Sequence, residues 1–197
     1  MMSFSLQFVL VLIGTFMIAL VLTPLVRLFS FKIDAVDYPN ARRINTKPMP
    51  SAGGLSIVIA FSIATLVFIP MLTSTTAPIK SYLSYTLPVV GAGWIIALTG
   101  LIDDVKELSA KKKMIGILLA ASLVWFLTDF RLNDFKIPFG GPLLHFEPWL
   151  SYLLTVIWIV SITNAVNLID GLDGLVSGVS IISIVTMGIV YYFFLPV

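Results

Sequence analysis

The chain has 197 residues, of which 58% are hydrophobic and only 11% are charged, whereas a soluble domain carries about 25% charged residues. With a mean hydropathy of +1.04, water is excluded as the solvent of the whole exterior, and a lipid bilayer is the expected environment. The net charge of +2 gives no indication of a nucleic-acid partner, and the absence of cysteine excludes a disulfide framework and a thiolate metal site.

Six apolar runs follow one another along the chain, separated by polar segments. Backbone groups in hydrocarbon must find their hydrogen bonds within the segment, so each run is predicted to form a helix. The runs cover residues 4–29, 55–72, 83–102, 114–130, 149–162 and 175–194. The sequence therefore predicts an all-α polytopic integral membrane protein, with about six transmembrane helices in a single transmembrane domain over residues 1–197.

Basic residues gather in alternate connections between these runs. Nine of the 12 fall on one side of the membrane, and the positive-inside rule makes that side cytoplasmic. This topology predicts cytoplasmic loops at about 30–53, 103–113 and 163–174, and it places the N-terminus outside.

The outer stretch 129–148 shows a different pattern. Apolar residues alternate with polar ones around Gly140 and Gly141, which favours two short strands joined by a turn. We therefore expect a small outer-face β-hairpin that rests on the membrane surface. His145, the only histidine, is expected to be an exposed interfacial residue of this stretch.

The first candidate for chemistry is the pair Asp103–Asp104 at the cytoplasmic end of the third run. Adjacent carboxylates repel each other, and charges near hydrocarbon are costly, so a compensating partner is expected. A divalent cation fits, because Mg²⁺ prefers hard carboxylate oxygens and completes its shell with phosphates. The alternative is a solvated helix end at which the acids pair with Lys106 or with the lysines at 111–113.

The second candidate is a polar row between the last two apolar runs. Its members recur every three residues, at Asn164, Asn167, Asp170 and Asp173. On an α-helix the row sweeps around about half the circumference, and on a 3₁₀ segment it forms a straight ridge. The alternative interpretation is a set of helix caps.

The third candidate is the first cytoplasmic loop, where Arg42, Arg43 and Lys47 supply positive charge at the membrane face. Arginine binds phosphate in a bidentate fashion, whereas lysine acts as a point charge. The alternative is the ordinary basic character of a cytoplasmic loop.

The motifs LIDDVKEL and NAVNLIDGLDGL resemble those of the polyprenyl-phosphate N-acetylhexosamine-1-phosphate transferases, and the similarity runs from about residue 37 to about residue 178. The resemblance implies transfer of an N-acetylhexosamine 1-phosphate, foremost GlcNAc 1-phosphate, from a UDP-sugar to undecaprenyl phosphate, with release of UMP. It also implies Mg²⁺, with Mn²⁺ as the alternative, a bacterial inner membrane, and the homodimers that family members often form. Such a reaction would begin the synthesis of a cell-wall or surface glycopolymer.

The resemblance assigns roles by motif. Asp103 and Asp104 match the catalytic acidic pair, which binds magnesium or deprotonates the lipid phosphate. The row Asn164, Asn167, Asp170 and Asp173 matches the nucleotide-proximal run, with Asp170 as a further metal ligand. Arg42, Arg43 and Lys47 fall in the loop expected to bind substrate phosphates, although Asn45 stands where members similar in this loop usually have histidine.

Family members continue through further helices, which carry another aspartate and a histidine-rich loop. This chain is therefore expected to be C-terminally truncated, either as a fragment or as a naturally short protein, and to hold half a site. Two alternative functions are a cation-coupled transporter, because intramembrane Asp and Asn also mark ion pathways, and an inactive membrane scaffold.

Overall fold

The computed structural model describes residues 4–39, 46–72, 79–137, 140–170 and 174–194. The chain divides into two compact units, Met1–Val156 and Ile157–Val197, and each is described by itself. Arg42, Arg43 and Asp173 lie outside the described residues.

Six long helical segments appear in the described part of the chain, one for each apolar run. They are α1 (Phe4–Lys32), the continuous stretch α2 (Gly54–Ile63), η1 (Ala64–Phe68) and α3 (Ile69–Leu72), then α4 (Ile79–Lys106), α5 (Ala110–Leu127), α6 (Pro148–Ile169) and α7 (Leu175–Phe194). The predicted all-α membrane fold is confirmed.

Four of these segments are long and apolar enough to cross a membrane, by length and composition: Leu6–Lys32, Gly54–Leu72, Ile79–Lys106 and Pro148–Ile169. Of the other two, α5 begins with the lysines at 111–113, and the apolar part of α7, Leu175–Val190, is shorter. The protein is therefore a multi-pass membrane protein.

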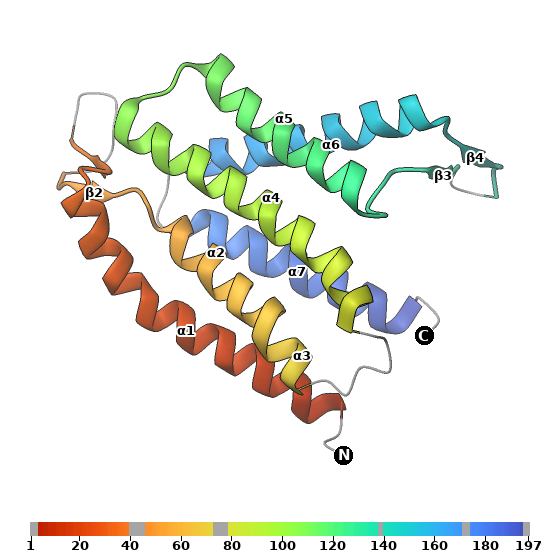
Figure 1. Ribbon diagram of the computed structural model, residues 1–197, viewed down its shortest axis with the longest axis horizontal. Helices are drawn as coiled ribbons and strands as arrows, with labels where there is room; N and C mark the ends of the chain where they lie inside the picture. The colour runs from red at the N-terminus through yellow and green to blue at the C-terminus, as the bar shows by residue number, and fades with distance from the viewer. Residues whose placement is uncertain (1–3, 40–45, 73–78, 138–139, 171–173, 195–197) are drawn as a thin grey trace. The chain divides into compact units, whose positions relative to one another are not determined.

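Within the first unit, α1 packs on α2, α2 on α4 and α4 on α5 (Figure 1). Small residues allow the close approach of α4 and α5, as is usual between helices in lipid. Gly116 of α5 faces the Thr99 side chain of α4 so closely that a Cβ atom would collide with it. Ala120 and Ala121, on the following turn, are buried. Large apolar side chains such as Phe16 point outward and are exposed, where lipid tails would cover them.

Among the described residues of the first unit there are also two short antiparallel strand pairs. The predicted hairpin is present as β3 (Asp134–Lys136) and β4 (Leu143–His145), and its location on the outer face stays a prediction. The pair of β1 (Val36–Asp37) with β2 (Met49–Pro50) was not predicted. This second pair folds the first loop back against the end of α1 and against α4.

Candidate active site

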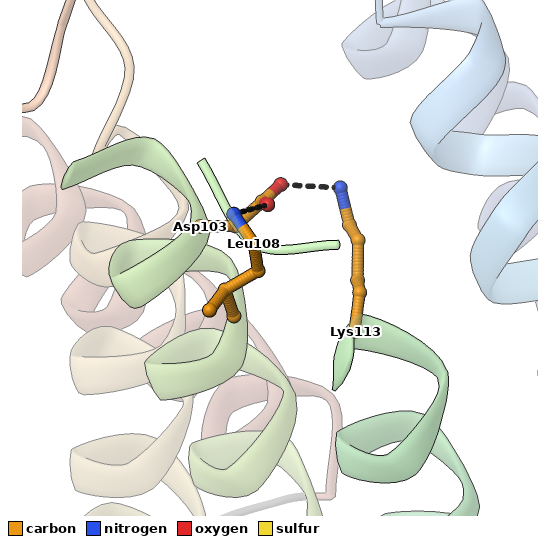
Figure 2. Close-up of polar contacts among 3 residues, drawn as sticks. All are labelled: Asp103, Leu108 and Lys113. Atoms are coloured by element: carbon orange, nitrogen blue, oxygen red, sulfur yellow. Dashed lines mark hydrogen bonds and ion pairs between the residues drawn. The ribbon is translucent and has the colours of Figure 1, made fainter. Parts of the chain in front are cut away.

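Asp103 lies in the last turn of α4, where the negative end of the helix dipole disfavours a carboxylate. Two donors compensate for this cost. The Nζ atom of Lys113 lies 2.6 Å from Oδ2, and the backbone N–H of Leu108 donates to Oδ1 at 3.0 Å, as Figure 2 shows. Because Leu108 follows α4 and Lys113 belongs to the first turn of α5, Asp103 ties the two helices together across their connection.

The α4–α5 connection itself is tight. Glu107 adopts the left-handed conformation with φ of 46°, and its N–H donates to the Asp103 carbonyl at 2.8 Å, a capping arrangement that ends α4. The chain then turns at Ser109, whose carbonyl accepts the N–H groups of Lys112 and Lys113. This turn brings the side chain of Lys113, rather than those of its neighbours, to Asp103. The alternative in which an acid pairs with the lysine triplet is therefore realised for Asp103.

Asp104 has different neighbours, because the next residue on a helix points about 100° away. Its carboxylate interacts with the Ser51 hydroxyl and with the charges of Asp37, Asp103 and Lys113. Together with Asp104 itself, we call these residues the α4-end cluster. Sequence reasoning missed Asp37 and Ser51 as members. The signal available was that Asp37 begins the DYPN segment on the same side as the acidic pair.

The first loop reaches Asp104 because its two ends are fixed near α1. The N–H of Ser51 donates to the Ala35 carbonyl at 3.1 Å, and the N–H of Ala52 donates to the Ser30 hydroxyl at 3.2 Å. Ser30 and Ala35 are fully buried. The Ser51 hydroxyl also lies 2.9 Å from the Ala35 carbonyl, so its single proton has two acceptors nearby.

Two further residues of this loop are described. The Tyr38 hydroxyl donates to the Asp34 carboxylate at 2.9 Å. This hydrogen bond and the negative charge of Asp34 raise the pKa of Tyr38 above its ordinary value. Lys47, the described member of the predicted phosphate-binding trio, lies in an exposed bend just before β2. Its predicted role stays a prediction.

The polar row is in the second unit. Asn164 and Asn167 belong to α6, which continues as an α-helix to Ile169, so the α-helical arrangement holds for these two residues. Asp170 follows the end of α6. The Asn164 amide donates to the Val160 carbonyl at 2.8 Å, while Asn167 and Asp170 are exposed. Gly174, with φ of 80°, precedes α7. The predicted pairing of this row with Asp103 and Asp104 stays a prediction.

The α4-end cluster suits Mg²⁺ in one respect and not in another. Mg²⁺ commonly takes one or two protein carboxylates and fills its shell with water and substrate phosphates. Asp104 fits this mode, whereas both oxygens of Asp103 are already engaged by Lys113 and Leu108. Across the described ranges, no three His, Cys, Asp or Glu side chains are grouped so that they could hold a metal by themselves. The cluster therefore fits a shared site with a phosphate ligand rather than a cage made by protein alone.

Comparison with known proteins gives the family. Residues 86–196 match the family described as Glycosyl transferase family 4, a range that includes both the acidic pair and the polar row. The chain belongs to this family. No solved structure matches it.

Curated relatives are similar over much of this chain. A Bacillus subtilis protein named "Probable undecaprenyl-phosphate N-acetylglucosaminyl 1-phosphate transferase" is 37% identical over 79% of this chain and 40% of its own length. Two proteins named "Decaprenyl-phosphate N-acetylglucosaminephosphotransferase" are also similar. The one from Mycolicibacterium smegmatis is 34% identical over 59% of this chain and 28% of its own length. The one from Mycobacterium leprae is 32% identical over 71% of this chain and 34% of its own length. The chain thus spans less than half the length of these relatives.

Proposed function

We propose that this chain forms part of an enzyme that transfers N-acetylglucosamine 1-phosphate from its UDP-sugar to undecaprenyl phosphate. A phosphate oxygen of the lipid attacks the β-phosphorus of the nucleotide. The bond from that phosphorus to the bridging oxygen breaks, and UMP leaves with the electron pair. The observation that carries the proposal is the α4-end cluster, which brings Asp104, Asp103 and Lys113 together at the end of a membrane helix. The curated relatives, which are named as polyprenyl-phosphate N-acetylglucosamine phosphotransferases, support it.

Phosphoryl transfer depends on alignment and on neutralising charge more than on a strong base. In this reaction Asp104 would hold Mg²⁺, or Mn²⁺ in its place. The bound ion would supply charge neutralisation for the two phosphates. Lys113 would supply a second positive charge, held in position by Asp103. Lys47, Arg42 and Arg43 are proposed to bind substrate phosphates.

The polar row is proposed to act on the nucleotide. Asn167 and Asp170 are exposed, so their amide and carboxylate groups are open to a ligand. Asp170 is also proposed as a further metal ligand, and Asn164 and Asp173 are proposed as further nucleotide contacts. The proposed assembly is a homodimer. We also propose that residues 1–197 form a single transmembrane domain.

The cluster is proposed to face the cytoplasm of a bacterial cell, at its inner membrane, with the N-terminus outside. The distribution of charge supports this orientation. Lys106 and the lysines at 111–113 lie at the cluster end of α4 and α5, whereas Lys80 begins α4 at the opposite end. The acids lie in the last turn of α4 rather than at its middle, which weighs against the transporter alternative, since transporters bind their ions near the bilayer midplane.

The test measures lipid-linked product. Membranes that contain the chain receive UDP-GlcNAc labelled in the sugar, undecaprenyl phosphate and Mg²⁺, and label that enters the organic phase is counted. In parallel, a chimera joins residues 1–197 to the remaining length of the Bacillus subtilis relative. We expect the chimera to form product that EDTA abolishes, and Asp104→Asn to remove it. Correctly inserted chimera without product would refute the assignment.

A further inference from the structure

The β3–β4 hairpin presents two different faces. Side chains alternate between the faces of a strand, and directly paired residues share a face. Phe135 pairs with Leu144, and Asp134 pairs with His145. One face therefore carries Phe135 and Leu144, which are 51% and 41% exposed. The other face carries Asp134, His145, Lys136 and, beside the turn, Leu143.

The polar face has its own internal contact. The Nδ1 atom of His145 lies 2.5 Å from a carboxylate oxygen of Asp134, and both side chains are largely exposed. A pair of this kind is stable where water solvates it and is costly in hydrocarbon. The two faces of the hairpin thus prefer different surroundings.

Two hydrogen bonds join the segment just before β3 to the first two turns of α6. The N–H of Leu132 donates to the Thr155 hydroxyl at 3.0 Å, and the Ser151 hydroxyl donates to Asn133 Oδ1 at 2.9 Å. Ser151 and Thr155 are buried, and neither they nor any other buried side-chain polar atom that the structure describes lacks a hydrogen-bond partner. These bonds hold the base of the hairpin beside the start of α6.

The position of the hairpin along the chain limits its distance from the membrane. Strand β4 ends at His145 and the membrane helix α6 begins at Pro148 (Figure 1), so the two are at most about 10 Å apart. The polar headgroup layer on each side of a bilayer is about 5–8 Å thick, so the hairpin lies within or just beyond this layer. Trp149, in the first turn of α6, is 67% exposed, as is usual for a tryptophan at a membrane interface.

We propose that the Phe135–Leu144 face lies on the lipid at the membrane surface, on the side opposite the α4-end cluster, with Asp134, Lys136 and His145 toward water. Phe126 and Leu127, in the last turn of α5 a few residues before the hairpin, are likewise exposed apolar residues. The bilayer that surrounds the start of α6 is the occupant of this face, because the chain allows the end of β4 to lie at most about 10 Å from that start. This inference does not depend on the proposed enzymatic function.

The absence of cysteine allows a direct test on the full chain. Phe135→Cys, Leu144→Cys and Lys136→Cys are each labelled with a nitroxide and placed in lipid nanodiscs, where both surfaces are accessible. Collision with oxygen, which concentrates in lipid, is compared with collision with a water-soluble nickel complex. All three positions are exposed, so the label disturbs no core packing, and Lys136→Cys is the matched control on the opposite face.

We expect the labels at positions 135 and 144 to favour oxygen and the label at 136 to favour the nickel complex. If all three favour the nickel complex, the hairpin stands in water and the proposal is wrong. The proposal is also wrong if the labels at 135 and 144 are shielded from both reagents and show spin–spin broadening that dilution with unlabelled chain removes. In that case a second copy of the chain covers the face.

Discussion

Replacing Lys113 by methionine removes the ammonium group that holds Asp103 while keeping a side chain of similar length. In the native protein the two groups are 2.6 Å apart, and their side chains are 30% and 21% exposed. The Lys113→Met variant leaves the Asp103 carboxylate with the Leu108 N–H as its remaining described donor. The expected result is a less stable connection between α4 and α5.

The magnitude follows from the partial exposure of the pair. Fully exposed ion pairs contribute about 0.2–1 kcal/mol, and removing one partner of a buried pair costs about 3–5 kcal/mol. A pair with a fifth to a third of its side-chain surface exposed lies between these limits, so we expect a loss of about 1–2 kcal/mol. For a chain of this length that loss lowers the unfolding temperature by roughly 2–8 °C.

The assay is thermal unfolding in detergent, with Lys112→Met as the matched control. That variant removes the same charge one position away, from an exposed side chain. A double-mutant cycle with Asp103→Asn, which keeps the acceptor for Leu108, isolates the coupling between the two groups. Equal unfolding temperatures for Lys112→Met and Lys113→Met, or a coupling below about 0.3 kcal/mol, would refute the reasoning.

Three other predictions concern separate parts of the first unit. Gly116→Ala should lower stability by about 1–3 kcal/mol, because the added Cβ collides with Thr99. Its control is Gly100→Ala, where a Cβ meets nothing within 4 Å and unfolding should not occur at a lower temperature. Ser151→Ala should cost about 1–3 kcal/mol, since the Trp125 indole N–H loses its acceptor; a native tryptophan emission spectrum and unchanged unfolding temperature would contradict this. Asp34→Asn should lower the pKa of Tyr38, measured as the difference between ultraviolet titrations of each protein with and without Tyr38→Phe. Because the pKa of Tyr38 in the folded protein is raised, the contribution of this residue to stability should decline as the pH rises from the ordinary tyrosine pKa to the raised one. Identical Tyr38 titrations in the native protein and in Asp34→Asn would exclude the Asp34 contact.

The sequence predicted each of the six helical segments, because an apolar run in lipid has few alternatives to a helix. It was less accurate at their ends. The run at 83–102 is part of α4, which extends to Lys106, and the run at 149–162 is part of α6, which extends to Ile169. Apolar runs stop at the first polar residues, whereas helical hydrogen bonding continues beyond the hydrocarbon. Asp103, Asp104, Asn164 and Asn167 are therefore helical residues within segments predicted as loops.

The hairpin was also predicted, since alternation and a glycine turn are local signals. The β1–β2 pair was not, because each strand has two residues and β2 contains Pro50. The pair is accompanied by hydrogen bonds from Ser51 and Ala52 to Ala35, which follows α1, and to Ser30 of α1, both fully buried. Those contacts join residues far apart in the chain, and no local sequence pattern predicts them.

Some residues of the candidate site were predicted from the sequence, and others were found only in the structure. Asp103 and Asp104 stood out in the sequence because carboxylates at the end of an apolar run are costly and need compensation. That cost does not say which group provides the compensation. The tight turn after Glu107 places Lys113, rather than another nearby lysine, beside Asp103. The folded first loop places Ser51 and Asp37 near Asp104. The sequence alone determined the membrane helices and the acidic pair, because hydrophobicity and charge act residue by residue; the tertiary structure decided the partners of that pair, because partners depend on how distant segments pack.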